Sequence, residues 1–194
     1  WNIRDVDRML SAIEPLAGVQ PGAIKIVARA ETASALVDAR DIGAASPRVI
    51  ALAFGAEDFT NDMGIERSDI GEEVQVPRSL VPVAARAANV ASLDSPFVLF
   101  QDLDALRADA KRARQMGYTG KFAIHPSQLD IINESFSPST EEIAYARQIT
   151  EAWKQAEAEG RGSLAMDGRM VDVPVVKRAQ NLLAFAEAIA ARKR

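Results

Sequence analysis

The chain has 194 residues, of which 48% are hydrophobic and 26% are charged, and its formal net charge is −4. These values predict a chain that buries a sizeable core, and the slightly acidic balance argues against a nucleic-acid-binding protein that uses a basic face. The absence of cysteine excludes disulfides, thiolate nucleophiles and zinc–thiolate sites, and no run of about 20 apolar residues predicts a membrane helix. We therefore expect a soluble, cytoplasmic protein whose natural N-terminus lies upstream of Trp1.

The first part of the chain alternates between expected helices and strands. In chain order, the hydrophobic periodicity and the terminating residues predict a helix over 3–17, a strand over 25–31, a helix over 33–43, a strand over 49–55, a polar loop over 60–78, a helix over 79–88, a strand over 91–100 broken by Pro96, a helix over 102–116 and a short strand over 122–125. This order implies parallel strands joined by right-handed crossovers. The long loop is either a lid or binding loop or a surface excursion.

After the last expected strand the alternation stops. Ser139 and Glu142 have capping-box spacing before an expected helix. A short polar segment, GRGSLAMDGRMVD, then leads into a last amphipathic helix whose apolar face begins at Val175. We expect an α/β unit over residues 1–133 and a helical C-terminal extension over residues 134–194.

Two acidic residues follow apolar strand-like runs. Glu31 ends the run KIVARAET, and Asp58 follows in VIALAFGAEDF. Because ligands bind at the carboxyl ends of parallel strands, we expect both carboxylates to face one crevice, where they suit a hard cation such as Mg²⁺. The alternative for Glu31 is a solvated carboxylate that starts a helix, and only one of Glu57 and Asp58 can face the crevice if strand geometry continues.

The motifs resemble those of a known family. Pattern alone leaves a doubly wound sheet and half of a (β/α)8 barrel equally open. Five colinear segments resemble successive blocks of the citrate lyase β-chain family, which includes malyl-CoA lyases and belongs to the HpcH/HpaI aldolase superfamily. These segments are ARAETASAL, ALAFGAEDFTNDMGI, VPRSLVPVAARAANV, GYTGKFAIHPSQLDIINESFSPS and DGRMVDVPVVKRAQNLL. The resemblance implies an α/β fold, a (β/α)8 TIM barrel of which about the last four strands are present, followed by a helical C-terminal lid.

Members of this family also carry an N-terminal half of the barrel, with an arginine that holds the substrate, and no segment of this chain resembles that half. We expect it to lie outside this chain, so that residue 24 opens the fifth barrel strand and that strand is unpaired on one side. The alternative is a truncated relative that acts as a non-catalytic scaffold or regulatory subunit.

The resemblance also assigns roles to three acidic residues. It selects Glu31 and Asp58 as Mg²⁺ ligands and Asp172 as the general base that exchanges a proton with an acetyl methyl group. In the family, the lid of a neighbouring subunit delivers this base, which implies a homo-oligomer, a trimer or a hexamer. Without the resemblance, Asp172 before Pro174 is a helix N-cap.

Three further residues are candidates for substrate binding. Arg29 lies two residues before Glu31 on the same strand face, as a cation beside the carboxylates or as a structural ion-pair partner. His125 lies in a block that borders the CoA-binding mouth in the family, although a lone histidine is more often a hydrogen-bonded structural group. Arg78 meets either a thioester phosphate or a surface acid.

Together, these implications predict a Mg²⁺-dependent carbon–carbon lyase. Its substrate is a β-hydroxyacyl-CoA or related thioester, cleaved to an acetyl thioester and a 2-oxo acid such as glyoxylate, or formed from them. The expected partners are therefore a CoA thioester and a 2-oxo acid. A malyl-CoA thioesterase with the same site is the alternative enzyme.

Overall fold

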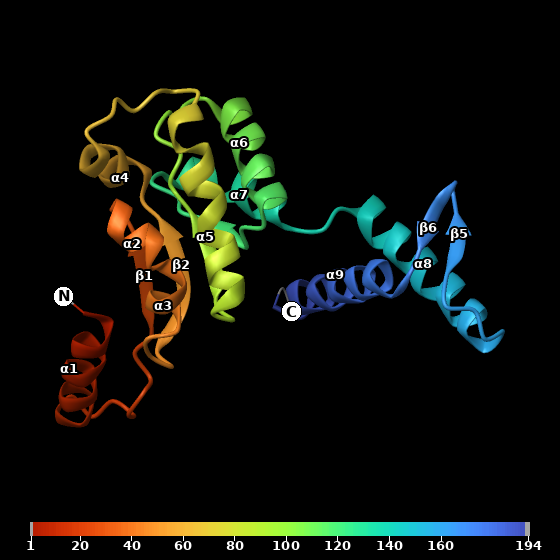
Figure 1. The fold of residues 1–194 in the computed structure, drawn as a ribbon, viewed down its shortest axis with the longest axis horizontal. Helices are drawn as coiled ribbons and strands as arrows, with labels where there is room; N and C mark the ends of the chain where they lie inside the picture. Colours follow the sequence, from red (N-terminus) through yellow and green to blue (C-terminus); the bar gives the residue numbers. More distant parts are fainter. Residues whose placement is uncertain (1, 193–194) are drawn as a thin grey trace. The chain divides into compact units, whose positions relative to one another are not determined.

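The protein is described by a computed structural model in which residues 2–192 are placed (Figure 1). The chain divides into two compact units, the first extending to Ile132 and the second beginning at Asn133. Within residues 2–192, no helix is both long enough and apolar enough to cross a membrane.

The first unit contains a four-stranded parallel sheet. Its elements are α1 (Ile3–Leu16), β1 (Ile26–Ala30), α2 (Ala33–Val37), α3 (Ala39–Gly43), β2 (Val49–Phe54), α4 (Ala56–Met63), the 3₁₀ turn η1 (Glu72–Val74), α5 (Gln75–Ala87), β3 (Ala91–Asp94), α6 (Leu103–Met116), β4 (Gly120–Lys121) and η2 (Pro126–Gln128), and α7 (Leu129–Phe136) leads into the second unit. The strands lie in the order β1-β2-β3-β4, and all neighbouring pairs are parallel. The predicted parallel α/β architecture is therefore confirmed. Among the described strands, β1 pairs only with β2, as the sequence predicts.

The two faces of β1 differ in exposure. Val27 and Arg29 of β1 lie on one face and are exposed, whereas Ala28 and Ala30 lie on the other face and are buried. Glu31 continues the alternation of the exposed face at the carboxyl end of the strand. Helices α3, α5 and α6 pack against the sheet (Figure 1). The largest fully buried apolar side chains of this unit are Phe54, Leu52, Leu106, Val74 and Val81.

Two sequence predictions in this unit are wrong in extent. The expected loop over 60–78 is mostly helical, because α4 reaches Met63, η1 covers Glu72–Val74 and α5 already begins at Gln75. Pro77 lies in the first turn of α5, where a missing backbone N–H costs no intrahelical hydrogen bond. The irregular segment is therefore confined to 64–71, and any lid function in this region falls to that shorter segment.

Three other expected elements are shorter or divided. The helix expected over 33–43 is two helices of five residues each, joined at Asp38, whose φ of −90° and ψ of 6° leave the helical region. β3 ends at Asp94, and β4 comprises only Gly120 and Lys121. The expected strand over 122–125 is wrong, because these residues follow β4 without extending its ladder.

A buried ion cluster joins α1 to the start of β2. The Arg48 guanidinium donates from Nη1 and Nη2 to the two carboxylate oxygens of Glu14, at 2.6 and 2.7 Å, and from Nε to Asp7 at 2.6 Å. Ser11 accepts a further hydrogen bond from Arg48 at 3.0 Å. Two backbone N–H groups after α1 also donate to the Glu14 carboxylate. The cluster therefore fixes α1 against the amino end of the sheet.

This cluster predicts a loss of stability in acid. The hydrogen bonds from Arg48 lower the pKa of Glu14 to about 2, from an ordinary value of 4.5. A carboxyl group with a lowered pKa stabilises the fold above the unfolded-state pKa, and this contribution is lost as the pH falls from about 4.5 toward 2. We expect the thermal midpoint of the wild-type chain to fall more between pH 7 and pH 3 than that of Glu14→Gln. Equal decreases in calorimetric scans would contradict this assignment.

The second unit is a pair of helices with a β-hairpin between them. It contains α8 (Thr140–Ala158), β5 (Leu164–Met166), β6 (Arg169–Val171) and α9 (Val173–Arg192). The predicted capping box is confirmed, because Ser139 Oγ accepts the Glu142 N–H at 3.1 Å while Glu142 accepts the Ser139 N–H at 2.8 Å. The hairpin was not predicted. Its turn is Asp167-Gly168, both with positive φ, which is the Asp-Gly signal of a tight hairpin turn.

Candidate functional site

The structure brings Glu31 and Asp58 together, as the sequence predicts. Glu31 directly follows β1, and Asp58 lies in the first turn of α4. Burial raises the pKa of Glu31 above its ordinary value; the Arg29 charge opposes this rise, and the neighbouring Asp58 carboxylate adds to it. The expectation that only one of Glu57 and Asp58 can face the crevice assumed that strand geometry continues. It does not apply, because both residues lie on the helix α4.

One oxygen of this pair lacks a hydrogen-bond donor. Glu31 Oε1 is buried and accepts no hydrogen bond. Arg29 Nη2 lies 2.7 Å from this oxygen, but the contact is an ion pair without hydrogen-bond alignment. Adjacent carboxylates with an unsatisfied buried oxygen fit a hard divalent cation, which would neutralise their mutual repulsion.

The protein side of such a site consists of two carboxylates. Over residues 2–192 there is no cluster of three or more His, Cys, Asp or Glu side chains that could hold a metal ion. This number suits Mg²⁺, which commonly binds through one or two carboxylates and fills its remaining positions with water or substrate oxygens. A metal held by Glu31 and Asp58 would therefore leave positions open to a ligand.

Arg29 lies beside the carboxylate pair. Its guanidinium carbon is 6.0 Å from the centroid of the Phe122 ring, and its Nη2 contacts Glu31. The residue thus places a cation next to Glu31, as expected from the strand alternation. Whether Arg29 also contacts substrate stays a prediction.

Arg78 belongs to a buried ion network between the sheet and its helices. Its Nε and Nη2 donate to the two carboxylate oxygens of Asp94, at 2.8 and 2.6 Å, and its Nη1 donates to Asp109 at 2.8 Å. Lys121 Nζ lies 2.6 Å from Asp94 and 2.6 Å from Asp109. Two cations and two anions therefore neutralise each other, which is the condition for burying charges without a large penalty.

This network was not predicted from the sequence. Burial opposes ionisation of Asp109, but the Lys121 and Arg78 charges hold its pKa below the ordinary value. Arg78 is only 11% exposed, and Asp94 is completely buried. The Arg78 side chain is thus paired inside the fold, and a contact with a thioester phosphate stays a prediction. The sequence feature that could have indicated this network is Asp94, an acidic residue at the carboxyl end of β3.

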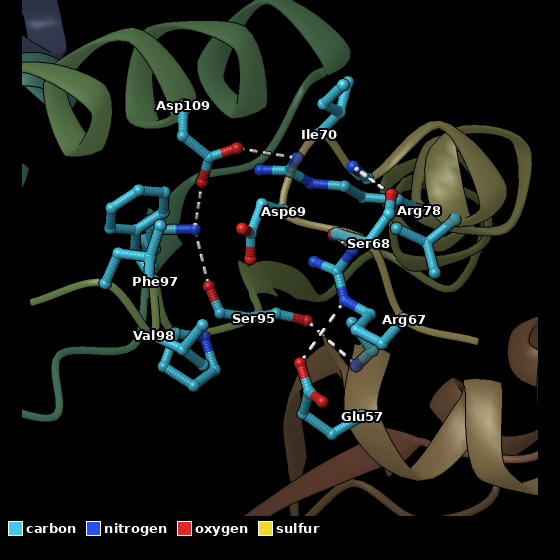
Figure 2. A pocket seen from close by; sticks show the side chains of 16 residues that line it. Glu57, Arg67, Ser68, Asp69, Ile70, Arg78, Ser95, Phe97, Val98 and Asp109 are labelled. Carbon is cyan, nitrogen blue, oxygen red and sulfur yellow. Dashed lines mark hydrogen bonds and ion pairs between the residues drawn. The ribbon is translucent and has the colours of Figure 1, made fainter.

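A cavity of about 240 Å³ lies next to the helix that carries Asp58 (Figure 2). Arg67 borders it and pairs with Glu57 at 3.3 Å and with Glu73 at 2.5 Å. Figure 2 shows Asp69 with its carboxylate in the middle of the cavity, between Arg67 and Asp109. Residues 67–71 therefore line a cavity rather than forming a free surface excursion.

His125 has a structural role in the described fold. Its Nδ1 accepts the Ser127 N–H at 3.2 Å and lies 2.8 Å from Ser127 Oγ, so it caps the turn η2. Its ring stacks on Phe100 with centroids 5.1 Å apart. Because Nδ1 accepts, the neutral ring carries its proton on Nε2. Contact of the exposed His125 with a ligand stays a prediction.

Asp172 lies in the second unit, between β6 and α9. Its Oδ1 accepts the Val175 N–H at 3.3 Å, and its carbonyl accepts the Val176 N–H at 3.0 Å. The helix-cap role is therefore present in the structure. The general-base role implied by the family resemblance stays a prediction.

Comparison with known proteins supports the resemblance. Citrate lyase subunit beta of Leuconostoc mesenteroides subsp. cremoris is 33% identical over 96% of this chain and 62% of its own length. The L-malyl-CoA/beta-methylmalyl-CoA lyase of Cereibacter sphaeroides (strain ATCC 17025) is 33% identical over 96% of this chain and 64% of its own length. The chain thus spans less than two thirds of the length of these curated relatives.

A solved structure gives a matching fold. The crystal structure of CitE from Mycobacterium tuberculosis, in complex with magnesium, acetoacetate and coenzyme A, is 29% identical with a TM-score of 0.73. The match covers 91% of this chain and 72% of that one. The HpcH/HpaI aldolase/citrate lyase family model matches residues 2–126, which include the sheet and both carboxylates. The chain therefore belongs to the HpcH/HpaI aldolase/citrate lyase family.

Proposed function

We propose that Glu31 and Asp58 bind Mg²⁺ and that this site serves a carbon–carbon lyase acting on a β-hydroxyacyl-CoA or related thioester. The observation that carries the proposal is the pair of adjacent carboxylates, one with a buried oxygen that accepts no hydrogen bond. The magnesium in the related CitE crystal and the lyase names of the relatives support it. When bound, Mg²⁺ supplies a Lewis acid that orients the oxygens of an oxo acid.

The reaction is a retro-Claisen cleavage. The bond between the hydroxyl-bearing carbon and the carbon next to the thioester breaks, and its electron pair passes to the thioester as an enolate. The hydroxyl carbon becomes the carbonyl of the 2-oxo acid as the hydroxyl loses its proton, and the enolate carbon gains a proton to form the acetyl group. We assign this second proton transfer to Asp172, acting as a general acid–base group.

The cation beside the site has a positioning role. Arg29 contacts Glu31 and lies over Phe122, so it holds the carboxylate on the exposed face of the sheet. We further propose that the chain forms the last four strands of a (β/α)8 barrel and that the second unit acts as its lid. In a homo-oligomer, trimeric or hexameric, the lid of one subunit would carry Asp172 to the metal site of the next.

Product analysis tests this function directly. We expect the barrel that contains this chain together with the N-terminal half, with Mg²⁺ and malyl-CoA as the probe, to release acetyl-CoA and glyoxylate in equal amounts, and EDTA to abolish the reaction. Release of free malate and CoA without glyoxylate would instead show a thioesterase with the same site. No product of either kind, from folded protein that binds Mg²⁺, would favour a non-catalytic scaffold.

A further inference from the structure

We propose that Gly55 is a positioning residue for the metal site, because the Glu31 side chain lies in the space that a side chain at position 55 would occupy. The inference rests on the proposed function, since it names what holds the Glu31 carboxylate beside Asp58. A Cβ atom on Gly55 would lie 2.4 Å from Glu31 Cγ, 2.6 Å from Oε1 and 3.0 Å from Cδ. Ordinary contacts between carbon atoms are about 3.5–4.0 Å long.

The backbone of Gly55 itself does not require glycine. Its φ of −117° and ψ of 91° lie where any L-residue is allowed. The glycine is therefore not explained by a left-handed turn or by strain. The three nearest atoms that a Cβ would meet all belong to the side chain of Glu31.

The backbone around Gly55 is held on both sides and cannot retreat from Glu31. The Gly55 N–H donates to the Ala30 carbonyl at 3.1 Å, which fixes the junction to β1. Ser95 Oγ donates to the Phe54 carbonyl at 2.8 Å and accepts the Ala56 N–H at 3.1 Å. One hydroxyl thus bridges the residue before Gly55 and the residue after it.

Ser95 is fixed in turn by the buried ion network. Lys121 Nζ donates to the Ser95 carbonyl at 2.6 Å and pairs with Asp94, the last residue of β3. Figure 2 shows Ser95 at the edge of the cavity, near Glu57 of α4. Because Lys121 is buried and paired, Ser95 has little freedom to shift. An added Cβ at position 55 would therefore displace Glu31 rather than the backbone.

The consequence for the metal follows from this geometry. Moving the Glu31 carboxylate away from Asp58 would leave one ligand where the site has two. Changes in groups that orient metal ligands typically weaken metal binding by about 10–100-fold. Gly55→Ala should weaken Mg²⁺ binding to that extent although it adds no charge and removes no ligand.

The experiment compares Gly55→Ala with the wild type and with Gly120→Ala in the full chain. Gly120, in β4, is a matched control because its Cβ would meet Leu93 rather than either carboxylate. Mg²⁺ binding is measured by titration calorimetry, and Mn²⁺ binding by electron paramagnetic resonance. We expect the Kd of Gly55→Ala to rise about 10–100-fold and that of Gly120→Ala to stay within twofold. A folded Gly55→Ala that binds Mg²⁺ within twofold of wild type overturns the proposal.

A second comparison keeps the proposal testable if Gly55→Ala does not fold. In a Glu31→Ala background the clash is removed, so the double variant should fold. The change in thermal midpoint caused by Gly55→Ala should be more favourable in that background than in the wild type. A double variant that is also unfolded, or equal changes in both backgrounds, overturns the proposal. A wrong assignment of the metal site can be distinguished from a failure of the Gly55 proposal. If the metal site is wrong, Glu31→Gln will bind Mg²⁺ as well as the wild type does. The midpoint comparison will still report the contact between position 55 and Glu31.

Discussion

Asp58→Asn and Glu31→Gln should each abolish Mg²⁺-dependent turnover in the barrel that contains this chain together with the N-terminal half. Each change keeps the shape of the side chain but removes the negative charge from one of the two protein ligands. We expect Mg²⁺ affinity to fall by at least about 100-fold, beyond the effect typical of groups that only orient ligands. Titration calorimetry with Mg²⁺ and initial rates at saturating substrate would measure the two losses separately.

These variants should not destabilise the metal-free protein. Burial and the Asp58 charge raise the pKa of Glu31, so ionised Glu31 opposes folding at neutral pH when no cation is bound. Glu31→Gln removes that opposing charge, and its metal-free midpoint should equal or exceed that of the wild type. Mg²⁺ should raise the midpoint of the wild type only, because it stabilises the state that binds it.

The matched control is Glu57→Gln, one residue earlier on α4. Glu57 pairs with Arg67, and its side chain is 60% exposed. We expect its metal affinity and turnover to stay within about twofold of wild type, the scatter expected for an exposed ion pair. Loss of metal binding in Glu57→Gln together with its retention in Asp58→Asn would assign the second ligand to Glu57 instead.

Asp172→Asn should reduce both cleavage and condensation by about 10²–10⁴-fold, the range for removal of a general acid–base group. Asparagine is as good an N-cap as aspartate, and it retains the oxygen that accepts the Val175 N–H. The variant therefore separates proton transfer from helix capping. Mg²⁺ affinity and the thermal midpoint should remain close to wild type, and solvent-deuterium exchange into the acetyl methyl group should be lost.

Mixed oligomers test whether Asp172 acts in a neighbouring subunit. In this proposal, oligomers of Asp172→Asn alone or of Glu31→Gln alone are inactive. An oligomer that contains both chains can form one intact site, with Glu31 and Asp58 from the Asp172→Asn chain and Asp172 from the Glu31→Gln chain. After subunit exchange, followed by mass spectrometry, part of the activity should return. No recovery in oligomers shown to contain both chains would leave Asp172 as a helix cap.

Some features of the fold were determined by local sequence. The alternation of apolar runs and helical patterns predicted four parallel strands, because parallel pairing follows from strand–helix–strand order. The Ser139–Glu142 capping box was also predictable, since both hydrogen bonds join residues three positions apart. Where the prediction failed, as in the segment 60–78, polar composition suggested a loop, and packing of α5 against the sheet stabilised a helix over its last part instead.

The sequence by itself determined the family, the parallel direction of the strands and the position of Glu31 at the end of one of them. Only the tertiary structure decided that the Glu31 side chain fills the space above Gly55, and that Arg78 is paired with Asp94 and Asp109 rather than exposed. The reason is physical. Strand alternation, helix periodicity and capping are read from residues a few positions apart, whereas these contacts join residues 16–31 positions apart and depend on the packing of helices against the sheet.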